Sequence, residues 1–371
     1  MNCAVAMNHK MNPARMIRTA ASVVVAACFG LAVCLDTARA CAFHSYKPEN
    51  TVIDWLLKAE HLVTARASQQ DDYTYQVAET LRDGEGPVPI TWLADGATRN
   101  RLAANPDDAL LFAYDVSSEK WRNVAYLSTA FRQVVDDVLT QEQDWGTQFH
   151  AARFRFFEDL LDHTDPAIRG LAIAEIDKAP YALLKTMAVK PSADRLLSDL
   201  WSPDDYQYQA IRILLLGLTG APEARAEILA FVDRTADWDW ARNLGAYSTA
   251  LVEIDGVAGV ELLDATLLSD HRQPLDKLEM VVEALAIHHG VGPRAVRDGI
   301  ARALDRLVRE RPQAAPLIAR QFGSRNDFSR EGALRGALRS KQLQSAEAFM
   351  SVASYIAQAG QPRTGNPLLS R

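Results

Sequence analysis

The stretch LLDHTDPAIRGLAIAEIDKAP, residues 160–180, decides the fold class of this chain. Asp165 precedes Pro166, and this order is typical of a helix start, because aspartate caps free backbone N–H groups and proline suits the first helical position. Apolar residues then recur at three- and four-residue spacing, at Ile168, Leu171, Ala172 and Ile176. This spacing places them on one face of a helix. The stretch therefore predicts an amphipathic helix that opens at an Asp-Pro turn.

The same stretch resembles a HEAT repeat, in which an Asp-Pro pair opens the second helix and an arginine follows, here Arg169. Similar phrases recur as GLTGAPEARAEILAFV from Gly217 and as GVGPRAVRDGIARALDRL from Gly290. The prolines of the three phrases are 56 and 71 residues apart, whereas regular repeats of this kind run to about 40–47 residues. The resemblance therefore implies an irregular, HEAT-like α-helical array over residues 148–359.

The pattern stays helical along the rest of this region. Short polar or Gly/Pro breaks separate apolar segments with helical spacing, which makes successive helices antiparallel neighbours. Helices are expected at residues 192–201, 203–217, 222–235, 238–254, 257–269, 274–289, 293–309, 313–322, 329–338 and 345–359. The tail at 360–371 contains two prolines and little apolar material, so we expect it to be disordered.

A different pattern precedes residue 130. Short apolar clusters between turn formers predict a helix at 51–60 and strands at 61–67, 73–81, 87–93, 109–114 and 122–127. Several short strands with turn signals between them are typical of a small β-barrel or sandwich, which we expect over residues 41–130. A connecting helix or linker at 131–147 would lead to the helical array. The predicted fold class is thus α+β, mainly α.

This β-rich region resembles the opening of secreted netrin-like domains, which are built on an OB-type barrel. The resemblance rests on an N-terminal cysteine of the mature chain, Cys41, and on the strings AEHLVTARA, YTYQVAETLRDG and DDALLFAY. In that family the first cysteine normally forms a disulfide, whereas Cys41 is the last cysteine of this chain. The resemblance therefore implies a barrel fold. It does not extend to protease inhibition, the activity of the tissue inhibitors of metalloproteinases that netrin-like domains resemble.

The N-terminus has the features of an export signal. Arg18 supplies a positive start, residues 20–35 form an apolar run, and Ala38-Arg39-Ala40 matches the A-x-A cleavage signature. The run is shorter than the roughly 20 residues that cross a membrane. We expect a signal peptide at 1–40, with Met16 as an alternative translation start. The mature chain would then be periplasmic or secreted, without a transmembrane segment.

Cleavage between Ala40 and Cys41 would leave one cysteine in the mature chain, because the other three lie within residues 1–40. A lipid anchor at Cys41 is the minority interpretation. Lipidation typically requires a pattern of small or aliphatic residues before the cysteine, with leucine three positions ahead, whereas here Ala38 occupies the leucine position and the charged Arg39 follows it. Soluble cleavage is the favoured interpretation.

Cys41 and His44 form a candidate metal site. Cleavage would give Cys41 a free α-amine beside its thiol, and His44 lies three residues on. An amine, a thiolate and an imidazole together suit copper or zinc. The N-terminal copper motif places histidine third, however, and here it is fourth. The alternative is an incidental thiol at a soluble terminus, and we predict no cofactor.

Trp201, Trp238 and Trp240 are candidate protein-binding residues. Trp238 and Trp240 lie between aspartates and an arginine in the string DWDWAR. Exposed tryptophans on an array surface can stack on sugar rings or anchor a partner. The alternative is core packing, because aromatic residues at a helix start usually pack against the preceding helix.

Charge and motifs narrow the function. The formal net charge is −7, and an acidic chain repels phosphate backbones, which argues against nucleic acid as a partner. Neither G-x-S-x-G nor H-E-x-x-H nor C-x-x-C occurs in the sequence, which weakens the case for an enzyme. Because helical arrays leave long faces for binding, we predict an exported, noncatalytic protein-interaction or scaffold protein of the bacterial periplasm, with a protein partner in the cell envelope.

Two alternatives remain open. The first is a cell-envelope hydrolase with acidic residues at the junction of the two regions, which would need two carboxylates facing each other across a cleft. The second is a metal- or redox-handling protein that uses Cys41 and His44.

Overall fold

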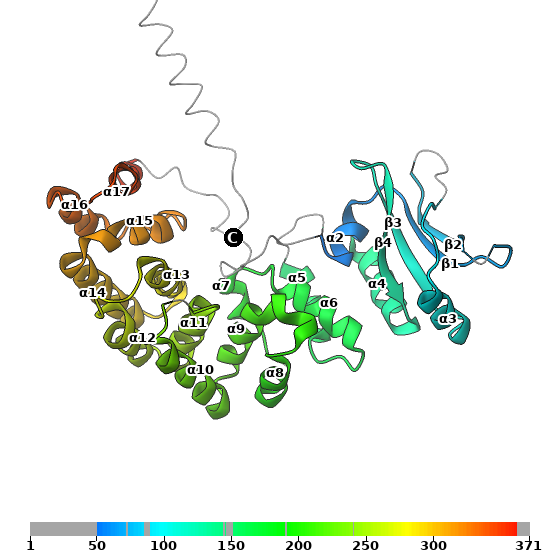
Figure 1. Ribbon diagram of the computed structural model, residues 1–371, viewed down its shortest axis with the longest axis horizontal. Coiled ribbons are helices and arrows are strands. Elements are labelled where there is room, and N and C mark those ends of the chain that lie inside the picture. The colour runs from blue at the N-terminus through cyan, green and yellow to red at the C-terminus, as the bar shows by residue number, and fades with distance from the viewer. Residues whose placement is uncertain are drawn as a thin grey trace, which may run out of the picture. The chain divides into compact units, whose positions relative to one another are not determined.

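The computed structural model describes residues 50–71, 73–84, 90–143, 145, 151–189, 191–239 and 241–361, which all belong to one unit, Ala40–Arg371. This part of the chain is mainly helical and contains one small antiparallel sheet of four strands (Figure 1). The predicted class, α+β and mainly α, is confirmed. Within the same residues, no helix is both long enough and apolar enough to cross a membrane.

Several sequence predictions fall on residues outside those that the structure describes. They are the signal peptide at 1–40 with its cleavage site at Ala38, Ala40 and Cys41, the metal pair Cys41 and His44, the indole of Trp240, and the tail from residue 362 onward. All of them stay predictions.

The sheet consists of β1 Leu62–Ala67, β2 Tyr75–Arg82, β3 Ala109–Asp115 and β4 Lys120–Leu127. Its strand order is β2-β1-β3-β4, and every neighbouring pair is antiparallel. The edge strands β2 and β4 do not pair with each other, so the sheet is open and the predicted barrel is wrong. A sandwich would need a second sheet, and the described residues form one.

The strand predicted at 87–93 explains the difference. Its described part, residues 90–93, has no strand ladder. Instead the indole N–H of Trp92 donates a hydrogen bond of 2.6 Å to the carbonyl of Trp121, and the chain continues into α3 Gly96–Ala104. In the described part of this segment, a side-chain anchor and a helix thus take the place of strand pairing.

Both faces of the sheet are covered. Helices α2 Val52–Lys58 and α4 Thr129–Gln141 pack on one face, where Leu111 belongs to the same core as the helical region. The next residue, Phe112, points to the opposite face and joins a second core that includes Leu102 of α3. This alternation is what a strand buried on both faces requires.

The rest of the described chain is helical. Its α-helices are α5 Ala151–Leu160, α6 Pro166–Ile176, α7 Tyr181–Leu184, α8 Ala193–Asp199, α9 Gln209–Thr219, α10 Pro222–Thr235, α11 Leu244–Asp255, α12 Val257–Leu263, α13 Leu275–Val291, α14 Arg294–Glu310, α15 Ala315–Gly323, α16 Glu331–Arg339 and α17 Ala346–Ala359. Two 3₁₀ turns, η1 Pro203–Tyr208 and η3 Pro312–Ala314, and a π-helical turn, η2 Asp264–Leu268, connect some of them.

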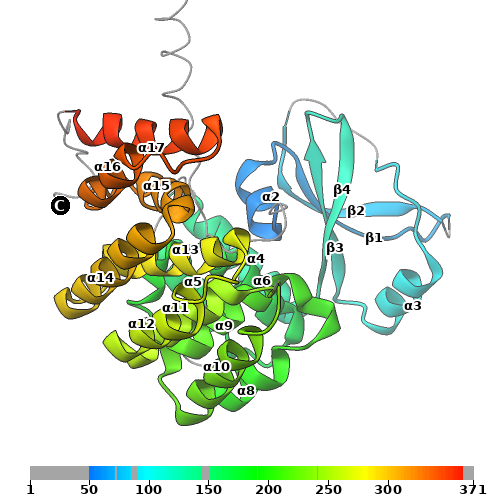
Figure 2. The ribbon, with the colours of Figure 1, turned by 60° about the vertical axis from the view of Figure 1, so that its left-hand side comes forward.

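Alternate helices stack in two layers. Helices α9, α11, α13, α15 and α17 contact one another in succession and form one layer. Helices α12, α14 and α16 do the same in a second layer, and pairs such as α11–α12 and α13–α14 connect the two. Figures 1 and 2 show each of these helices beside the ones that precede and follow it in the chain.

Gly217 of α9 lies close against α11. A Cβ atom there would lie 2.6 Å from the Cβ of Ala250 in α11. Real Cβ atoms do not come so close, so glycine is what lets these two helices pack at this point.

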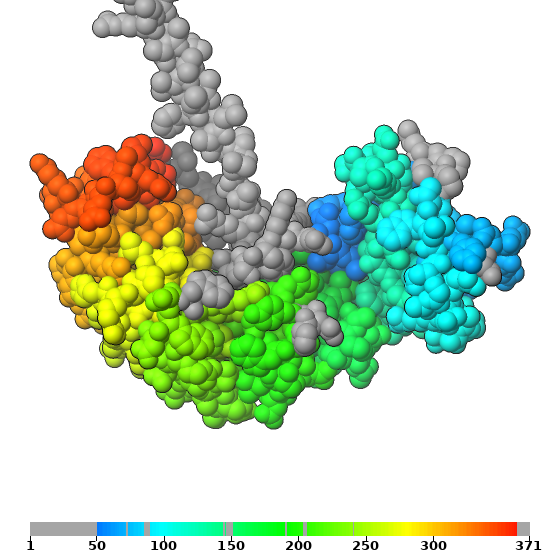
Figure 3. All heavy atoms as spheres, in the orientation of Figure 1, coloured from blue at the N-terminus to red at the C-terminus, as the bar shows by residue number. Residues whose placement is uncertain are grey.

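A buried ion cluster joins α2 to α5 and α6, which lie side by side in Figures 1 and 3. The Nη2 atom of Arg153 lies 3.1 Å from Asp54 and 2.5 Å from Glu175. The Nζ atom of Lys178 lies 2.6 Å from Asp54 and 2.9 Å from Glu175. Burial alone would raise the pKa of Asp54, but Lys178, the backbone N–H of Thr51 and Arg153 outweigh it and lower that pKa to about 2. Two cations thus balance two anions in the core.

Candidate binding pocket

Three exposed aromatic side chains converge on one pocket. Trp201, Tyr206 and Trp238 are 59%, 42% and 48% exposed, and together they line a cavity of about 360 Å³ that we call the aromatic pocket. The other described lining residues are Gln209, Phe231, Arg234, Ala241, Arg242, Asn243 and Tyr247. The structure therefore brings together Trp201 and Trp238, which the sequence offered as separate candidates.

Two irregular segments carry these aromatics. Trp201 follows α8, and Tyr206 lies in η1 immediately before α9. Trp238 lies between α10 and α11, where a helix was predicted from residue 238; that prediction is wrong, because the helix begins at Leu244. The preceding Asn243 has a left-handed φ of 61°, which asparagine tolerates better than most residues do. Trp238 is thus not packed at a helix start.

Gln209 ties the two segments together. Its Nε2 atom donates a hydrogen bond of 3.2 Å to the carbonyl of Leu200, just before Trp201. Its Oε1 atom accepts a hydrogen bond of 2.5 Å from Nδ2 of Asn243, on the other segment. Because Gln209 is buried, one amide side chain fixes both walls of the aromatic pocket.

Lys277 of α13 holds the segment that presents Trp238. Its side chain is fully buried, and its Nζ atom donates hydrogen bonds of 2.6 Å to the carbonyl of Trp238 and of 2.6 Å to Oε1 of Gln273. A further hydrogen bond goes to the carbonyl of Thr235. Burial lowers the pKa of Lys277, against the charges of three nearby aspartates that raise it. Backbone carbonyls and the side-chain amide of Gln273, rather than a carboxylate, therefore satisfy this buried ammonium group.

Tyr247 contributes a buried hydroxyl to the aromatic pocket. Its ring stacks on Phe231 with centroids 3.6 Å apart and planes 8° from parallel, and only 1% of the residue is exposed. The hydroxyl has no hydrogen-bond partner in the described chain. Burial raises the pKa of Tyr247, and so does the charge of Glu227, whereas Arg234 lowers it. Since buried polar groups are nearly always paired, this hydroxyl is an unsatisfied neutral donor on a residue that lines the aromatic pocket.

Two arginines give the aromatic pocket a positive lining. Among its described lining residues, Arg234 and Arg242 are the charged ones. The guanidinium carbon of Arg242 lies 4.0 Å from the ring centroid of Tyr206, a cation–π geometry that orients it. Arg234 is about half-exposed, with Glu227 as an ion-pair partner at 3.6 Å. Flat apolar walls and guanidinium groups together suit an apolar side chain that lies next to a carboxylate.

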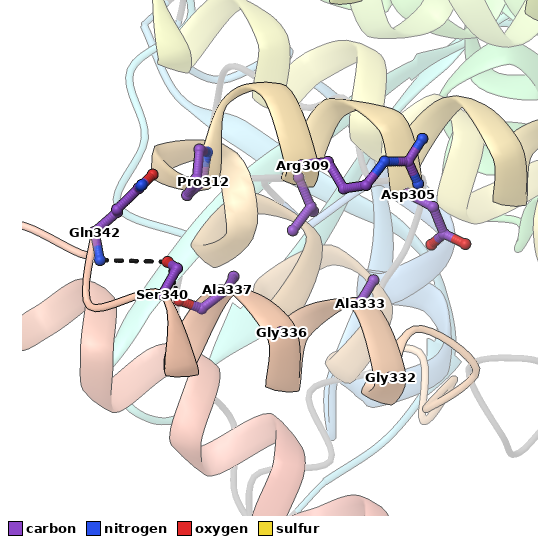
Figure 4. A pocket seen from close by; sticks show the side chains of 10 residues that line it. Asp305, Arg309, Pro312, Gly332, Ala333, Gly336, Ala337, Ser340 and Gln342 are labelled. Carbon is purple, nitrogen blue, oxygen red and sulfur yellow. Dashed lines mark hydrogen bonds between the residues drawn. The ribbon is translucent and has the colours of Figure 1, made fainter.

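A larger cavity of about 570 Å³ lies between α14 and α16 (Figure 4). Small residues of α16 form much of its wall, Gly332, Ala333, Gly336 and Ala337, and Asp305 and Arg309 project from α14. None of its lining residues carries a buried, unpaired side-chain atom. The aromatic pocket is therefore the stronger candidate site, although it is smaller.

The acidic residues at the junction of sheet and helices are paired with cations. At the junction of sheet and helices, Asp54 and Glu175 are each paired with cations, and the lowered pKa of Asp54 is the opposite of what a general acid needs. Arg195 likewise lies 3.3 Å from Asp162 in an acidic surface depression. Within the described residues, no group of three His, Cys, Asp or Glu side chains is placed to hold a metal ion.

Sequence reasoning missed most of the aromatic pocket. Arg234 and Arg242 each lie four residues from Trp238 in the sequence, but they were not assigned to binding from the sequence. Phe231 and Tyr247 carried no local signal, because each lies within an apolar helical pattern that also fits an ordinary core. Comparisons with protein-family models, with curated proteins and with solved structures find no match to this chain.

Proposed function

We propose that this protein is an exported, noncatalytic binding protein that presents the aromatic pocket to a protein partner in the bacterial cell envelope. The convergence of Trp201, Tyr206 and Trp238 on one cavity carries this proposal. Tryptophan, tyrosine and arginine are the residues that most often dominate protein–protein binding energy, above all where they line a pocket. Arg234 and Arg242 complete that set.

The helical region supports the proposal as a scaffold. Its two layers of stacked alternate helices are the arrangement expected of a HEAT-like array, in which each helical pair packs on its neighbours. The aromatic pocket is formed by the ends of α8, α10 and α11 and by η1. Gln209 and Lys277 hold these ends in place from α9 and α13. Such preorganisation lowers the entropic cost of binding.

Site-specific photocrosslinking tests the proposal. A benzophenone amino acid replaces Trp201 in one variant and Leu93 in a control; Leu93 is 72% exposed and belongs to the sheet region. Each full-length chain is produced with its N-terminal segment in a bacterial host, and cross-linked species are identified by mass spectrometry. We expect a discrete protein adduct from position 201 and none from position 93.

Two results would contradict the proposal. Equal crosslinking from positions 201 and 93 would mean that the aromatic pocket has no special role. A chain that keeps residues 1–40, measured by intact mass, would contradict the export signal.

A further inference from the structure

We propose that the aromatic pocket recognises the C-terminus of its partner: one large apolar or aromatic side chain in the cavity, with the α-carboxylate bound by Arg234 and Arg242. This inference rests on the proposed function, because it assigns the chemistry of the partner segment to the same pocket. It is argued from the volume, the walls and the charge of the cavity.

The volume limits what can enter. A cavity of about 360 Å³ lies at the lower end of the roughly 300–1,000 Å³ typical of ligand pockets. It therefore accommodates a single large side chain with its own backbone rather than a long segment. Phe231 and Tyr247 supply a buried aromatic wall, and Trp201 and Trp238 supply exposed ones. Aromatic walls of this kind favour an aromatic or branched apolar side chain.

The charges indicate one carboxylate beside that side chain. Arg234 and Arg242 are the charged groups of the described lining, and guanidinium groups bind carboxylates with paired hydrogen bonds. Asp237 and Asp239 are exposed on either side of Trp238, so a segment with several acidic residues would be repelled at the rim. The C-terminus of a protein combines one carboxylate with one side chain and carries no further acidic residue beyond it.

The hydroxyl of Tyr247 fits the same ligand. It is buried and without a partner, and its raised pKa keeps it protonated as a hydrogen-bond donor. A carboxylate oxygen or the last backbone carbonyl of the partner accepts such a bond. A sugar fits less well, because its hydroxyls need acceptors as well as donors, and the Gln209 amide is already engaged at both its atoms.

The test uses a tetrapeptide library with all residues at its last position, synthesised once with free C-terminal acids and once with C-terminal amides. The full chain is immobilised, and retained peptides are identified by mass spectrometry. We expect retention of free acids that end in Phe, Tyr, Trp or Leu. Amidation is expected to reduce retention about tenfold or more, since hydrogen bonds between charged groups are the stronger ones.

Variants locate the binding. Arg234→Gln and Arg242→Gln are expected to weaken retention of the free acids and leave the amides unchanged, and Trp238→Ala is expected to abolish both. Leu93→Ala, an exposed apolar residue outside the aromatic pocket, serves as the matched control and keeps wild-type retention. Thermal unfolding of each variant confirms that it is folded.

The outcomes separate this inference from the proposed function. Equal retention of acids and amides that is lost in Trp238→Ala would overturn C-terminal recognition and leave a peptide-binding pocket. Retention that survives Trp238→Ala, or no retained peptide at all, would overturn the inference, and the crosslinking at position 201 would then decide the proposed function by itself. Pocket-dependent binding of an oligosaccharide but of no peptide would overturn both.

Discussion

Removing the hydroxyl of Tyr247 should make the protein more stable. Tyr247→Phe keeps the ring that stacks on Phe231 at 3.6 Å and deletes only a buried oxygen that has no hydrogen-bond partner in the described chain. An unpaired buried polar group costs about 1–3 kcal/mol. We take the lower end, because the hydroxyl borders a cavity, and expect the free energy of unfolding to rise by about 1 kcal/mol. For a chain of this size that is a rise in melting temperature of about 2 °C.

Tyr355 supplies the matched control, since it is also buried, at 2% exposed. Its hydroxyl donates a hydrogen bond of 2.7 Å to the carbonyl of Asp327 and accepts one of 3.1 Å from the N–H of Arg330. The same Tyr→Phe change therefore strands two backbone groups and should lower the free energy of unfolding by about 1–2 kcal/mol. The two substitutions are chemically identical, but they should change the free energy of unfolding in opposite directions.

Urea unfolding, followed by far-UV circular dichroism, measures the free energy of unfolding of both variants and of the wild type. The free energies are compared where all three proteins show the same dependence on urea concentration. Tyr247→Phe should also bind the free-acid peptides more weakly than wild type does, so that stability and binding move in opposite directions. If Tyr247→Phe destabilises the protein as much as Tyr355→Phe does, the hydroxyl is paired within the folded chain. The aromatic pocket would then lack its unsatisfied donor, and the argument for a ligand there would fail.

Three further predictions concern the scaffold. Glu175→Gln removes one anion from the buried cluster and leaves two cations, Arg153 and Lys178, on the single carboxylate of Asp54, so urea unfolding should show a loss of about 3–5 kcal/mol; a loss below about 1 kcal/mol would contradict this. Burial lowers the pKa of His288 to about 4, so below about pH 6.5 the unfolded chain binds a proton that the folded chain does not. The free energy of unfolding should therefore fall by about 3 kcal/mol between pH 6.5 and pH 4. This pH dependence should be absent in His288→Gln. Gly217→Ala should destabilise by about 1–3 kcal/mol because its Cβ overlaps α11, whereas Gly170→Ala, with nothing within 4 Å of its Cβ, should stabilise by about 0.5–1 kcal/mol in thermal unfolding.

The helices were predictable where their signals are local. Helix α10 begins at Pro222 and ends at Thr235 as predicted, because proline at the first position and the apolar spacing that follows both lie within the helix. The start of α11 was not predictable in this way. The segment before it is held by Lys277, a residue far along the chain that donates a hydrogen bond to the carbonyl of Trp238. The spacing of apolar residues near residue 238 contains no information about a hydrogen bond to α13.

In the sheet and in the aromatic pocket too, local features were predictable from the sequence and long-range contacts were not. Alternation and turn residues located the four strands, but closure of the sheet depends on which edges meet. The described residues 90–93 of the expected fifth strand are held by the hydrogen bond from Trp92 to the carbonyl of Trp121 and do not pair as a strand. Likewise Trp201 and Trp238 were recognisable as residues that often bind partners. That they share one cavity depends on the packing of α8 against α10, which no local pattern encodes.

Several residues that break local rules lie at or beside the aromatic pocket. An unpaired buried hydroxyl on Tyr247, a fully buried Lys277 that contacts carbonyls instead of a carboxylate, and a left-handed Asn243 all lie at or beside it. Exposed Trp201 and Trp238 add apolar surface that folding leaves uncovered. By contrast, the ion cluster under α2 is fully paired. Since locally unfavourable features persist where function requires them, these features support the aromatic pocket as a binding site.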